Sequence, residues 1–463
     1  MRYVSTRGLA PALGFEDVML TGLAPDGGLY VPEAWPKLTS REIGLLQDLS
    51  YPALVSAISA PFVDGSAGDL AEVAAEAYAP FERLVPLVEL GHGLWLLELF
   101  WGPTLAFKDY ALQLLGRLLE ASLAARNARA LVLGATSGDT GSAAIEACRD
   151  RSRLDVVILH PHGRVSDVQR RQMTTVAAAN VHNVAVRGTF DDCQRLVKAM
   201  LADPALRSDL GVTSVNSINW VRIMAQVAYY FAGALALGAP DRQVSFAVPT
   251  GNFGNVFAAY VARQMGLPIH SLIIGTNRNN VVARFFETGR LSIDTVVPTI
   301  TPAMDIQVPS NLERLLFDLL GRDGEAIRSL MSEFAAHGQV DIDPVGLQRL
   351  QTFMTGWWFD EPAIRQTLAD VFEQTSLLID PHTAIGIAAA RSTQRNPDIP
   401  VICVGTAHPA KFPDAVESAT GVRPPLPGRL ADLFERTETV TVLPPDRHTL
   451  EAFVRGIAGL GDR

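Results

Sequence analysis

A lysine between aromatic residues stands at the start of a helical pattern. Lys108 lies close to Phe107 and Tyr110, and leucine and alanine residues follow at helical spacing over residues 111–119. The positive end of a helix and an apolar surrounding both disfavour an ammonium ion, so such a lysine tends toward the neutral amine that attacks a carbonyl. Taken alone, the pattern also fits a surface lysine whose stem covers Phe107.

The second candidate for chemistry is a glycine-punctuated loop, which consists of Gly251, Asn252, Phe253, Gly254 and Asn255. It follows an apolar run at residues 244–248 and precedes a helical pattern at residues 256–264. Backbone N–H groups at such a strand–loop–helix junction form a cradle for an anion, and glycine lets a phosphate approach closely. A tight turn that needs glycine for a positive φ is the alternative explanation.

The third candidate is the segment Gly-Ala-Thr-Ser-Gly-Asp-Thr-Gly at residues 134–141, which follows a strand-like run and leads into a small-residue helix. Its hydroxyls and N–H groups at a helix N-terminus suit a carboxylate or a phosphate. The segment lacks the Gly-Lys-Ser/Thr ending of a Walker loop and the glycine spacing of the dinucleotide fingerprint. A capped turn without a ligand remains the alternative.

A nucleophilic lysine together with two anion-binding loops indicates pyridoxal phosphate as cofactor. The lysine would bind the aldehyde as a Schiff base, one loop would hold the cofactor phosphate, and the other would receive the carboxylate of the substrate.

These residues need a framework of buried strands. Short apolar runs rich in β-branched residues alternate with helical patterns, which predicts parallel α/β sheets. The predicted strands lie at residues 131–133, 156–159, 181–186, 244–248, 272–275 and 401–404. The chain up to about residue 90 lacks this alternation and is expected to form a mostly helical domain. Residues 223–240 carry no charge, but a buried helix is the favoured interpretation over a membrane span.

Composition excludes some classes of function. The chain has 463 residues, of which 48% are hydrophobic and 19% charged, with a formal net charge of −10. The length predicts more than one domain, and the negative charge argues against nucleic acid and anionic membranes as partners. The cysteines Cys148, Cys193 and Cys403 are too few and too widely spaced for a disulfide framework. With no secretory signal visible, a cytoplasmic enzyme is expected. No metal site is expected.

Several motifs in one order resemble the threonine synthase family over nearly the whole chain. They are the N-terminal residues 1–8, Asp-Gly-Gly-Leu-Tyr-Val-Pro at 26–32, Pro-Thr-Leu-Ala-Phe-Lys-Asp at 103–109, and the segments 134–141, 216–222, 249–255, 380–384 and 406–412. The resemblance implies a pyridoxal-phosphate enzyme of fold type II, with mostly parallel sheets in two α/β domains and an N-terminal helical domain. The expected domains are residues 1–90, 91–215 with the lysine and the 134–141 segment, and 216–463 with the phosphate loop.

The resemblance also implies roles for individual residues. Lys108 would form the Schiff base and then move protons at substrate carbons, and the loop 251–255 would hold the cofactor phosphate. Thr406 would meet the pyridine nitrogen, where a hydroxyl gives a milder electron sink than a carboxylate. The implied reaction converts O-phospho-L-homoserine and water to L-threonine and phosphate by γ-elimination and β-hydration, in a monomer or homodimer. The N-terminal domain or residues 302–311 would act as a lid.

Residues at the substrate end are less well defined by the sequence. The candidates are Thr104, Ser137, Thr140, Asn216, Ser217, Asn219 and Arg222. Asn219 and Arg222 are three residues apart at a helix start, so they are expected to face one ligand, with Arg222 gripping a phosphate through two N–H donors. The alternative for Arg222 is a contact with a buried carboxylate. Lys411 is interpreted as a solvated charge on a turn.

Two other functions stay open at the level of sequence. A fold type II lyase or dehydratase could share the cofactor motifs and act on another phosphorylated or hydroxylated amino acid, in which case residues 216–222 would differ in role. A cofactor-free binding protein is the other alternative, and an intact Lys108 beside an intact phosphate loop argues against it.

Overall fold

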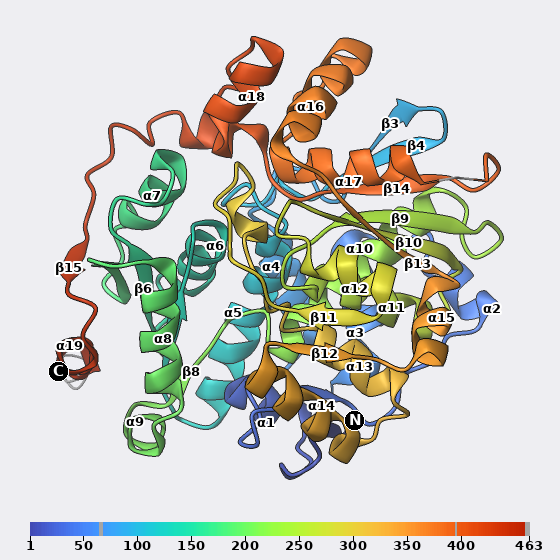
Figure 1. Ribbon diagram of the computed structural model, residues 1–463. Coiled ribbons are helices and arrows are strands. Elements are labelled where there is room, and N and C mark those ends of the chain that lie inside the picture. Colours follow the sequence, from blue (N-terminus) through green and yellow to red (C-terminus); the bar gives the residue numbers. More distant parts are fainter. Residues whose placement is uncertain (64–67, 394–395, 459–463) are drawn as a thin grey trace.

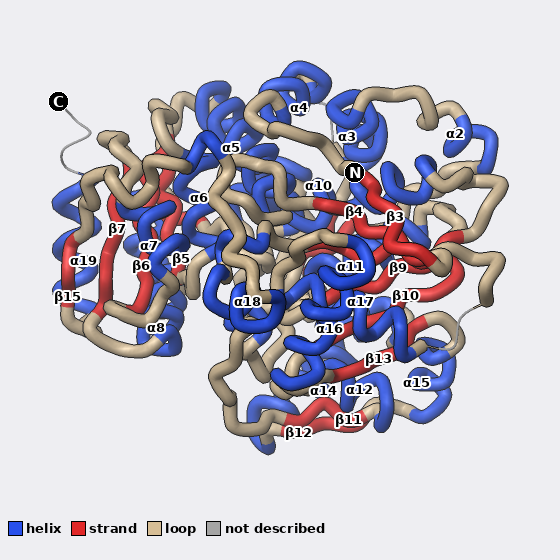
Figure 2. Tube along the Cα trace, turned by 90° about the horizontal axis from the view of Figure 1, so that it is seen from above, coloured by secondary structure: helices blue, strands red, loops and turns tan. Residues whose placement is uncertain are grey.

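The computed structural model describes residues 1–63, 68–393 and 396–458. Its two main sheets lie in separate parts of the molecule, each with helices packed against it (Figures 1 and 2). The larger sheet has the strand order β13 (Met354–Trp358), β10 (Ile269–Thr276), β9 (Val244–Pro249), β14 (Val401–Gly405), β4 (Leu94–Glu98) and β3 (Leu87–Gly91). The smaller sheet has the order β15 (Thr441–Leu443), β7 (Val181–Val186), β6 (Leu154–Pro161), β5 (Ala130–Ala135) and β8 (Val212–Thr213).

All pairings in these two sheets are parallel except that of β3 with β4. The predicted fold class is therefore confirmed, and each of the six predicted strands is present. Their continuous apolar runs are buried on both faces, as parallel strands between helix layers require. Short antiparallel pairs join β1 (Tyr3–Ser5) to β2 (Tyr30–Pro32) and β11 (Arg290–Ser292) to β12 (Gln339–Asp341).

Helices make up the rest of the framework. Those of the N-terminal part are α1 (Phe15–Thr21), α2 (Ser40–Gly44), α3 (Tyr51–Ser59) and α4 (Leu70–Tyr78). Those in the smaller-sheet part are α5 (Lys108–Ala125), α6 (Asp139–Cys148), α7 (Asp167–Thr174), α8 (Phe190–Leu201), α9 (Pro204–Leu210) and α19 (Arg447–Ala458). Those in the larger-sheet part are α10 (Trp220–Ala236), α11 (Gly254–Gln264), α12 (Val281–Thr288), α13 (Leu312–Leu319), α14 (Gly324–His337), α15 (Pro344–Gln351), α16 (Glu361–Thr375), α17 (Pro381–Ser392) and α18 (Pro413–Thr420).

Short 3₁₀ turns join some of these elements, namely η1 (Ala60–Phe62), η2 (Pro302–Met304), η3 (Pro409–Lys411) and η4 (Gly428–Leu430). The charge-free stretch expected as a buried helix is α10, in which nearly every residue is buried. Among the described residues, no helix is both long and apolar enough to span a membrane.

The sheets cross the expected domain boundaries at two places. Strand β4 falls in the segment expected with the lysine domain, yet it pairs with β14 of the larger sheet. The chain after α18 returns along the edge of the molecule to the smaller sheet, where β15 pairs with β7 (Figure 1). The N-terminal part is mostly helical, but it shares one buried core with α5, α10 and α11. It is therefore packed into the body of the molecule.

Candidate active site

Lys108 is the first residue of α5, where the sequence pattern places it. Its side chain is 13% exposed, and Nζ lies 3.2 Å from Oδ2 of Asp139 and 4.9 Å from the centre of the Phe107 ring. Helix α5 is long and leucine-rich, and its packing against α6 and α10 fixes the position of its first turn. The amine is thus held in an apolar surrounding beside one carboxylate.

A second lysine reaches the same carboxylate. Lys411 is fully buried; its Nζ lies 2.9 Å from Oδ1 of Asp139 and donates to the carbonyl of Thr104 at 2.7 Å. The prediction of a solvated charge on a turn is therefore wrong. The turn η3 carries Lys411 inward because the loop after β14 pairs with the loop before α5. The Phe107 N–H donates to the Thr406 carbonyl at 2.9 Å, and the His408 N–H to the Leu105 carbonyl at 3.0 Å.

Burial and three nearby charged groups act on the protonation of the Lys108 amine. Burial lowers the pKa of Lys108 below its ordinary value, and the positive charges of Lys411 and Arg222 lower it further against the opposing effect of Asp139. Burial alone would raise the pKa of Asp139, but the two lysines hold it well below its usual range. Asp139 is therefore a permanent anion, and Lys108 is a candidate nucleophile and base.

The segment 134–141 forms the turn between β5 and α6. The Thr136 hydroxyl accepts the N–H groups of Gly138 at 2.9 Å and Gly141 at 2.8 Å, which fixes the loop. At Gly138 φ is +146°, and a Cβ there would lie 2.4 Å from the Gln169 side chain, so only glycine fits. The structure leaves the side chains of Ser137 and Thr140 half-buried, with Ser137 on the wall of a cavity.

The loop 251–255, which was predicted to hold the phosphate and is called the phosphate loop, follows β9 and includes the first two residues of α11. Phe253 adopts a left-handed φ of 64° and buries its ring. The Asn255 side chain accepts the Thr250 hydroxyl at 2.7 Å and donates to the Pro249 carbonyl at 2.8 Å. Asn255 therefore shapes the loop, and the N–H groups at the start of α11 are available to an anion, since the first turn of a helix lacks internal acceptors for them.

The segment proposed as a lid lies against this loop. The Asn311 backbone N–H and side-chain amide both donate to the Asn252 carbonyl, at 3.1 and 3.2 Å. A Cβ on Gly251 would lie 2.6 Å from the Ala303 carbonyl oxygen. Residues 302–311 thus close over one side of the phosphate loop in this structure.

Thr406 follows β14 at the same end of the sheet. Its N–H donates to the Thr383 hydroxyl at 3.1 Å, while its own hydroxyl is buried and has no hydrogen-bond partner among the described residues. Such a hydroxyl is free to form a hydrogen bond with a ligand. A pyridine nitrogen is such a partner, so Thr406, Lys108 and the α11 N-terminus together fit pyridoxal phosphate.

The structure brings together only some of the residues that were expected to bind the substrate. The Asn219 side chain is fully buried, caps α10 by accepting the Val221 N–H, and donates to the Met19 carbonyl at 2.9 Å. Its amide is thus occupied by backbone groups and does not face a ligand jointly with Arg222. Ser217 lies beside the phosphate loop, with its Cβ 3.8 Å from a Cβ placed on Gly254.

Arg222 is buried, and one of its N–H groups donates to the Val215 carbonyl at 3.2 Å. Its Nε has no partner, and no carboxylate within the described chain forms an ion pair with it. The alternative of a contact with a buried carboxylate is therefore not observed. Burial lowers the pKa of Arg222 to about 10. A buried, charged guanidinium without a counter-ion is suited to an anionic ligand.

Asn216 and Thr104 form hydrogen bonds within their own segments. The Asn216 N–H donates to the Ser214 hydroxyl at 3.2 Å, and its carbonyl accepts the Asn219 N–H. The Thr104 hydroxyl donates to Oδ1 of the buried Asp109 at 2.6 Å, so it is satisfied within its own loop.

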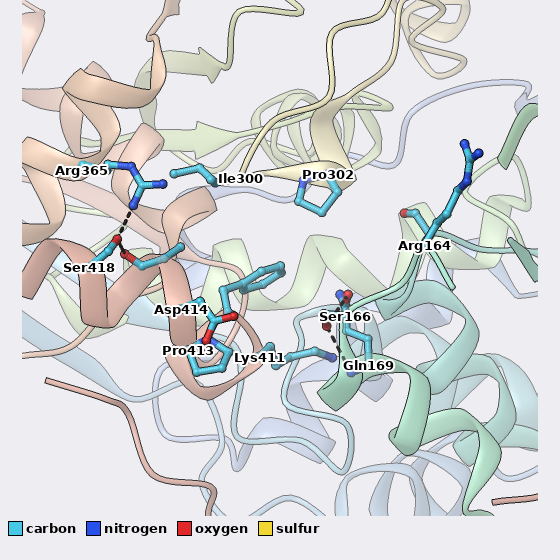
Figure 3. Close-up of a pocket in the computed structure, with 13 residues that line it drawn as sticks. Arg164, Ser166, Gln169, Ile300, Pro302, Arg365, Lys411, Pro413, Asp414 and Ser418 are labelled. Atoms are coloured by element: carbon cyan, nitrogen blue, oxygen red, sulfur yellow. Dashed lines mark hydrogen bonds between the residues drawn. The ribbon is translucent and has the colours of Figure 1, made fainter. Parts of the chain in front are cut away.

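A cavity of about 690 Å³ opens beside the lysine cluster (Figure 3). It is lined by Ser137, Arg164, Ser166, Gln169, Ile300, Pro302, Arg365, Lys411, Phe412, Pro413, Asp414, Ala415 and Ser418. These residues come from segments far apart in the sequence, which is why Arg164 and Arg365 could not be predicted from spacing. With Lys411, they give the wall three cations against the single carboxylate of Asp414.

The sequence matches known families along its length. Residues 2–78 match "Threonine synthase N terminus", residues 74–353 match "Pyridoxal-phosphate dependent enzyme", and residues 383–454 match "Threonine synthase, C-terminal". The chain is 52% identical over 459 residues to the threonine synthase of Pseudomonas aeruginosa, with 98% of each chain covered.

Solved structures agree with these matches. The pyridoxal-phosphate-bound threonine synthase of Brucella melitensis has a TM-score of 0.96 and 48% identity, and the yeast threonine synthase has a TM-score of 0.93 and 35% identity; 99% of each chain is covered in both comparisons. The chain therefore belongs to the threonine synthase family of pyridoxal-phosphate-dependent enzymes.

Proposed function

We propose that this chain converts O-phospho-L-homoserine and water to L-threonine and inorganic phosphate. The observation that carries the proposal is the grouping of three features around Lys108. They are its buried amine, the unsatisfied hydroxyl of Thr406, whose carbonyl accepts the Phe107 N–H, and the unpaired guanidinium of Arg222, whose charge acts on the Lys108 amine. The match to threonine synthases over almost the whole chain supports the same reaction. A monomer or homodimer in the cytoplasm is the proposed form.

Three groups would hold the cofactor. Lys108 would bind the aldehyde carbon, the loop 251–255 and the start of α11 would bind the phosphate, and the Thr406 hydroxyl would meet the pyridine nitrogen. When bound, pyridoxal phosphate supplies an electron sink for the charge that develops on the substrate carbons.

The protein groups then bind the substrate and move its protons. The α6 N-terminus, with Ser137 and Thr140, receives the substrate carboxylate. The cavity cations Arg164 and Arg365 attract the substrate phosphate, which the net charge of −10 would otherwise repel. The free Lys108 amine would take the α-proton and then a β-proton as phosphate leaves the γ-carbon, and it would return protons at the γ-carbon and, after water adds at the β-carbon, at the α-carbon. Residues 302–311 limit water to the molecule that adds at the β-carbon.

The segment 216–222, which includes Ser217 and Arg222, lies beside the phosphate loop. We infer that Arg222 neutralises a bound phosphate or carboxylate from this side, and that Asn219 and Asn216 hold the segment in shape. Thr104 supports the Lys108 loop through Asp109.

The test is to give the cofactor-loaded protein O-phospho-L-homoserine and to quantify threonine and phosphate in the same samples. Equal amounts of both products are expected. Phosphate with a keto acid in place of threonine would instead assign the chain to the lyase alternative, and absence of turnover would contradict both reactions.

A further inference from the structure

Two lysines share one buried carboxylate in this structure. Asp139 Oδ2 faces Lys108 at 3.2 Å, while Oδ1 faces Lys411 at 2.9 Å and accepts the Gln169 side-chain amide at 2.8 Å. The Asp139 carboxylate is thus fully engaged, and only one of its oxygens is directed at the reactive amine.

Lys411 is held more rigidly than Lys108. It is fully buried, and its amine also donates to the carbonyl of Thr104, which accepts the Gln172 amide at 3.1 Å as well. The loop pairing between residues 105–107 and 406–408 fixes the distance between the two lysines. These contacts of Lys411 do not involve Lys108.

The charges that face Lys108 come from three elements. They are the anion Asp139 of α6 and the cations Lys411 of η3 and Arg222 of α10. If Lys411 were neutral, the whole charge of Asp139 would act on Lys108 and one repelling cation would be gone. Both changes favour the ammonium form, which is neither a nucleophile nor a base.

We propose that Lys411 is a positioning residue that keeps Asp139 in a permanent ion pair, so that this carboxylate orients the Lys108 amine without retaining a proton on it. The proposal rests on the proposed function only in taking Lys108 as the reacting amine. The ion pair of Lys411 and Asp139 then holds the Lys108 amine in one position whenever the substrate has displaced that amine from the cofactor.

The test measures the pKa of Lys108 in the cofactor-free protein. The rate of Lys108 acetylation by acetic anhydride is followed against pH by peptide mass spectrometry for the wild type, Lys411→Met and Lys411→Arg. Lys411→Met is expected to raise the pKa of Lys108 by about one unit, which lowers the reactive fraction about tenfold at neutral pH. Lys411→Arg keeps the cation and should stay close to the wild type, as should Lys198→Met, which changes an exposed lysine.

Other outcomes separate this role from its rivals. If Lys411 served only to bind the substrate phosphate, Lys411→Met would raise KM and leave the acetylation profile unchanged, which would overturn the proposal. An equal shift in Lys411→Arg and Lys411→Met would also overturn it, because charge would then not be the cause. Asp139→Asn provides a second check, since loss of the anion should lower the pKa of Lys108. Because labelling needs no turnover, these results stand even if threonine is not the product.

Discussion

At the level of single residues, Lys108 is the proposed reacting amine. Its removal takes away both the covalent anchor of the cofactor and the proton carrier, so Lys108→Ala should lower threonine formation by roughly 10²–10⁴-fold or more. The helix start itself depends on packing of α5, so the circular dichroism spectrum should not change. Borohydride reduction of the loaded protein should label the wild type and Lys198→Ala but not Lys108→Ala. Full activity in Lys108→Ala would refute the mechanism.

Replacement of Arg222 is expected to raise the stability of the cofactor-free protein and to lower its affinity for a bound anion. As a buried cation without a counter-ion it destabilises the cofactor-free protein, so Arg222→Met should raise its free energy of unfolding by about 0.5–2 kcal/mol. The same change removes a partner for a bound anion, so affinity for cofactor or substrate should fall roughly tenfold or more. Thermal unfolding without ligand and a cofactor titration measure the two effects. A loss of stability in Arg222→Met would show that Arg222 has a structural role.

Single residues differ in how well the sequence predicts them. The flanking aromatic residues and the following helical pattern place Lys108, because those signals are local. Lys411 is misjudged since its burial depends on Asp139 and Thr104, which are distant in the chain. Asn219 is expected to bind a ligand, but the Met19 carbonyl, from the N-terminal part, occupies its amide. Residues whose partners are distant could not be assigned from spacing alone.

At the level of elements, continuous apolar runs identify the buried strands and the turns after them. Strand β13 gave no such signal: Gly356 interrupts it, and Trp358 at its end is 49% exposed. The predicted strand–loop–helix at residues 244–264 matches β9, the phosphate loop and α11. What spacing could not predict is that residues 302–311 lie on this loop.

A substitution at Gly251 tests the contact between residues 302–311 and the phosphate loop. A Cβ at this position would lie 2.6 Å from the Ala303 carbonyl oxygen and 3.2 Å from Met304 Cα, so Gly251→Ala must displace backbone. Overpacking of this kind costs about 1–3 kcal/mol, and it should weaken cofactor binding by roughly five- to hundredfold if the loop takes the strain. Titration of cofactor-free protein with pyridoxal phosphate measures this. Gly428→Ala is the control, because nothing lies within 4 Å of its Cβ.

The turn η3 is expected to make the protein sensitive to acid. His408 Nδ1 accepts the Ala410 N–H at 3.2 Å and so requires the neutral ring. Burial, with the charge of Arg429, lowers the pKa of His408 from 6.5 to about 4. Between these values the unfolded chain binds a proton that the folded chain does not, so stability falls with decreasing pH, by about 3 kcal/mol in total.

His408→Asn keeps a cap acceptor and removes this proton uptake. The free energy of unfolding, measured by denaturant titration from pH 7 to pH 4, should therefore depend less steeply on pH in His408→Asn than in the wild type. The exposed His448→Asn should keep the wild-type slope. An unchanged slope in His408→Asn would mean that other groups cause the acid sensitivity.

In the whole molecule, the order of strands is set by pairings between distant segments. Strands β3 and β4 precede the lysine helix in sequence but complete the larger sheet, and β15 returns from the C-terminal part to the smaller one. Hydrophobic patterns predict where strands lie but not which strands pair. Parallel sheets could therefore be predicted, but not which strands belong to each sheet. The returning segment links the two parts whose facing loops form the cavity (Figure 1).

The returning segment should therefore support the smaller-sheet part from outside. Leu450 of α19 is 1% exposed and packs in one apolar cluster with Val184 of β7 and Cys193 of α8. Leu450→Ala leaves a cavity there and should lower the free energy of unfolding by about 2–5 kcal/mol. Leu45→Ala, at a residue that is 72% exposed, is the matched control and should have little effect.

Cysteine labelling shows whether this loss is local. Burial raises the pKa of Cys193 and of Cys148 to about 12, so both thiols should resist a disulfide reagent in the folded protein. Cys148 lies in a different apolar cluster, which α19 does not cover. Leu450→Ala should therefore accelerate modification of Cys193 well before that of Cys148, as peptide mass spectrometry can resolve. Equal acceleration at both thiols would mean that the molecule opens as one unit, and that α19 stabilises the whole fold through the smaller sheet.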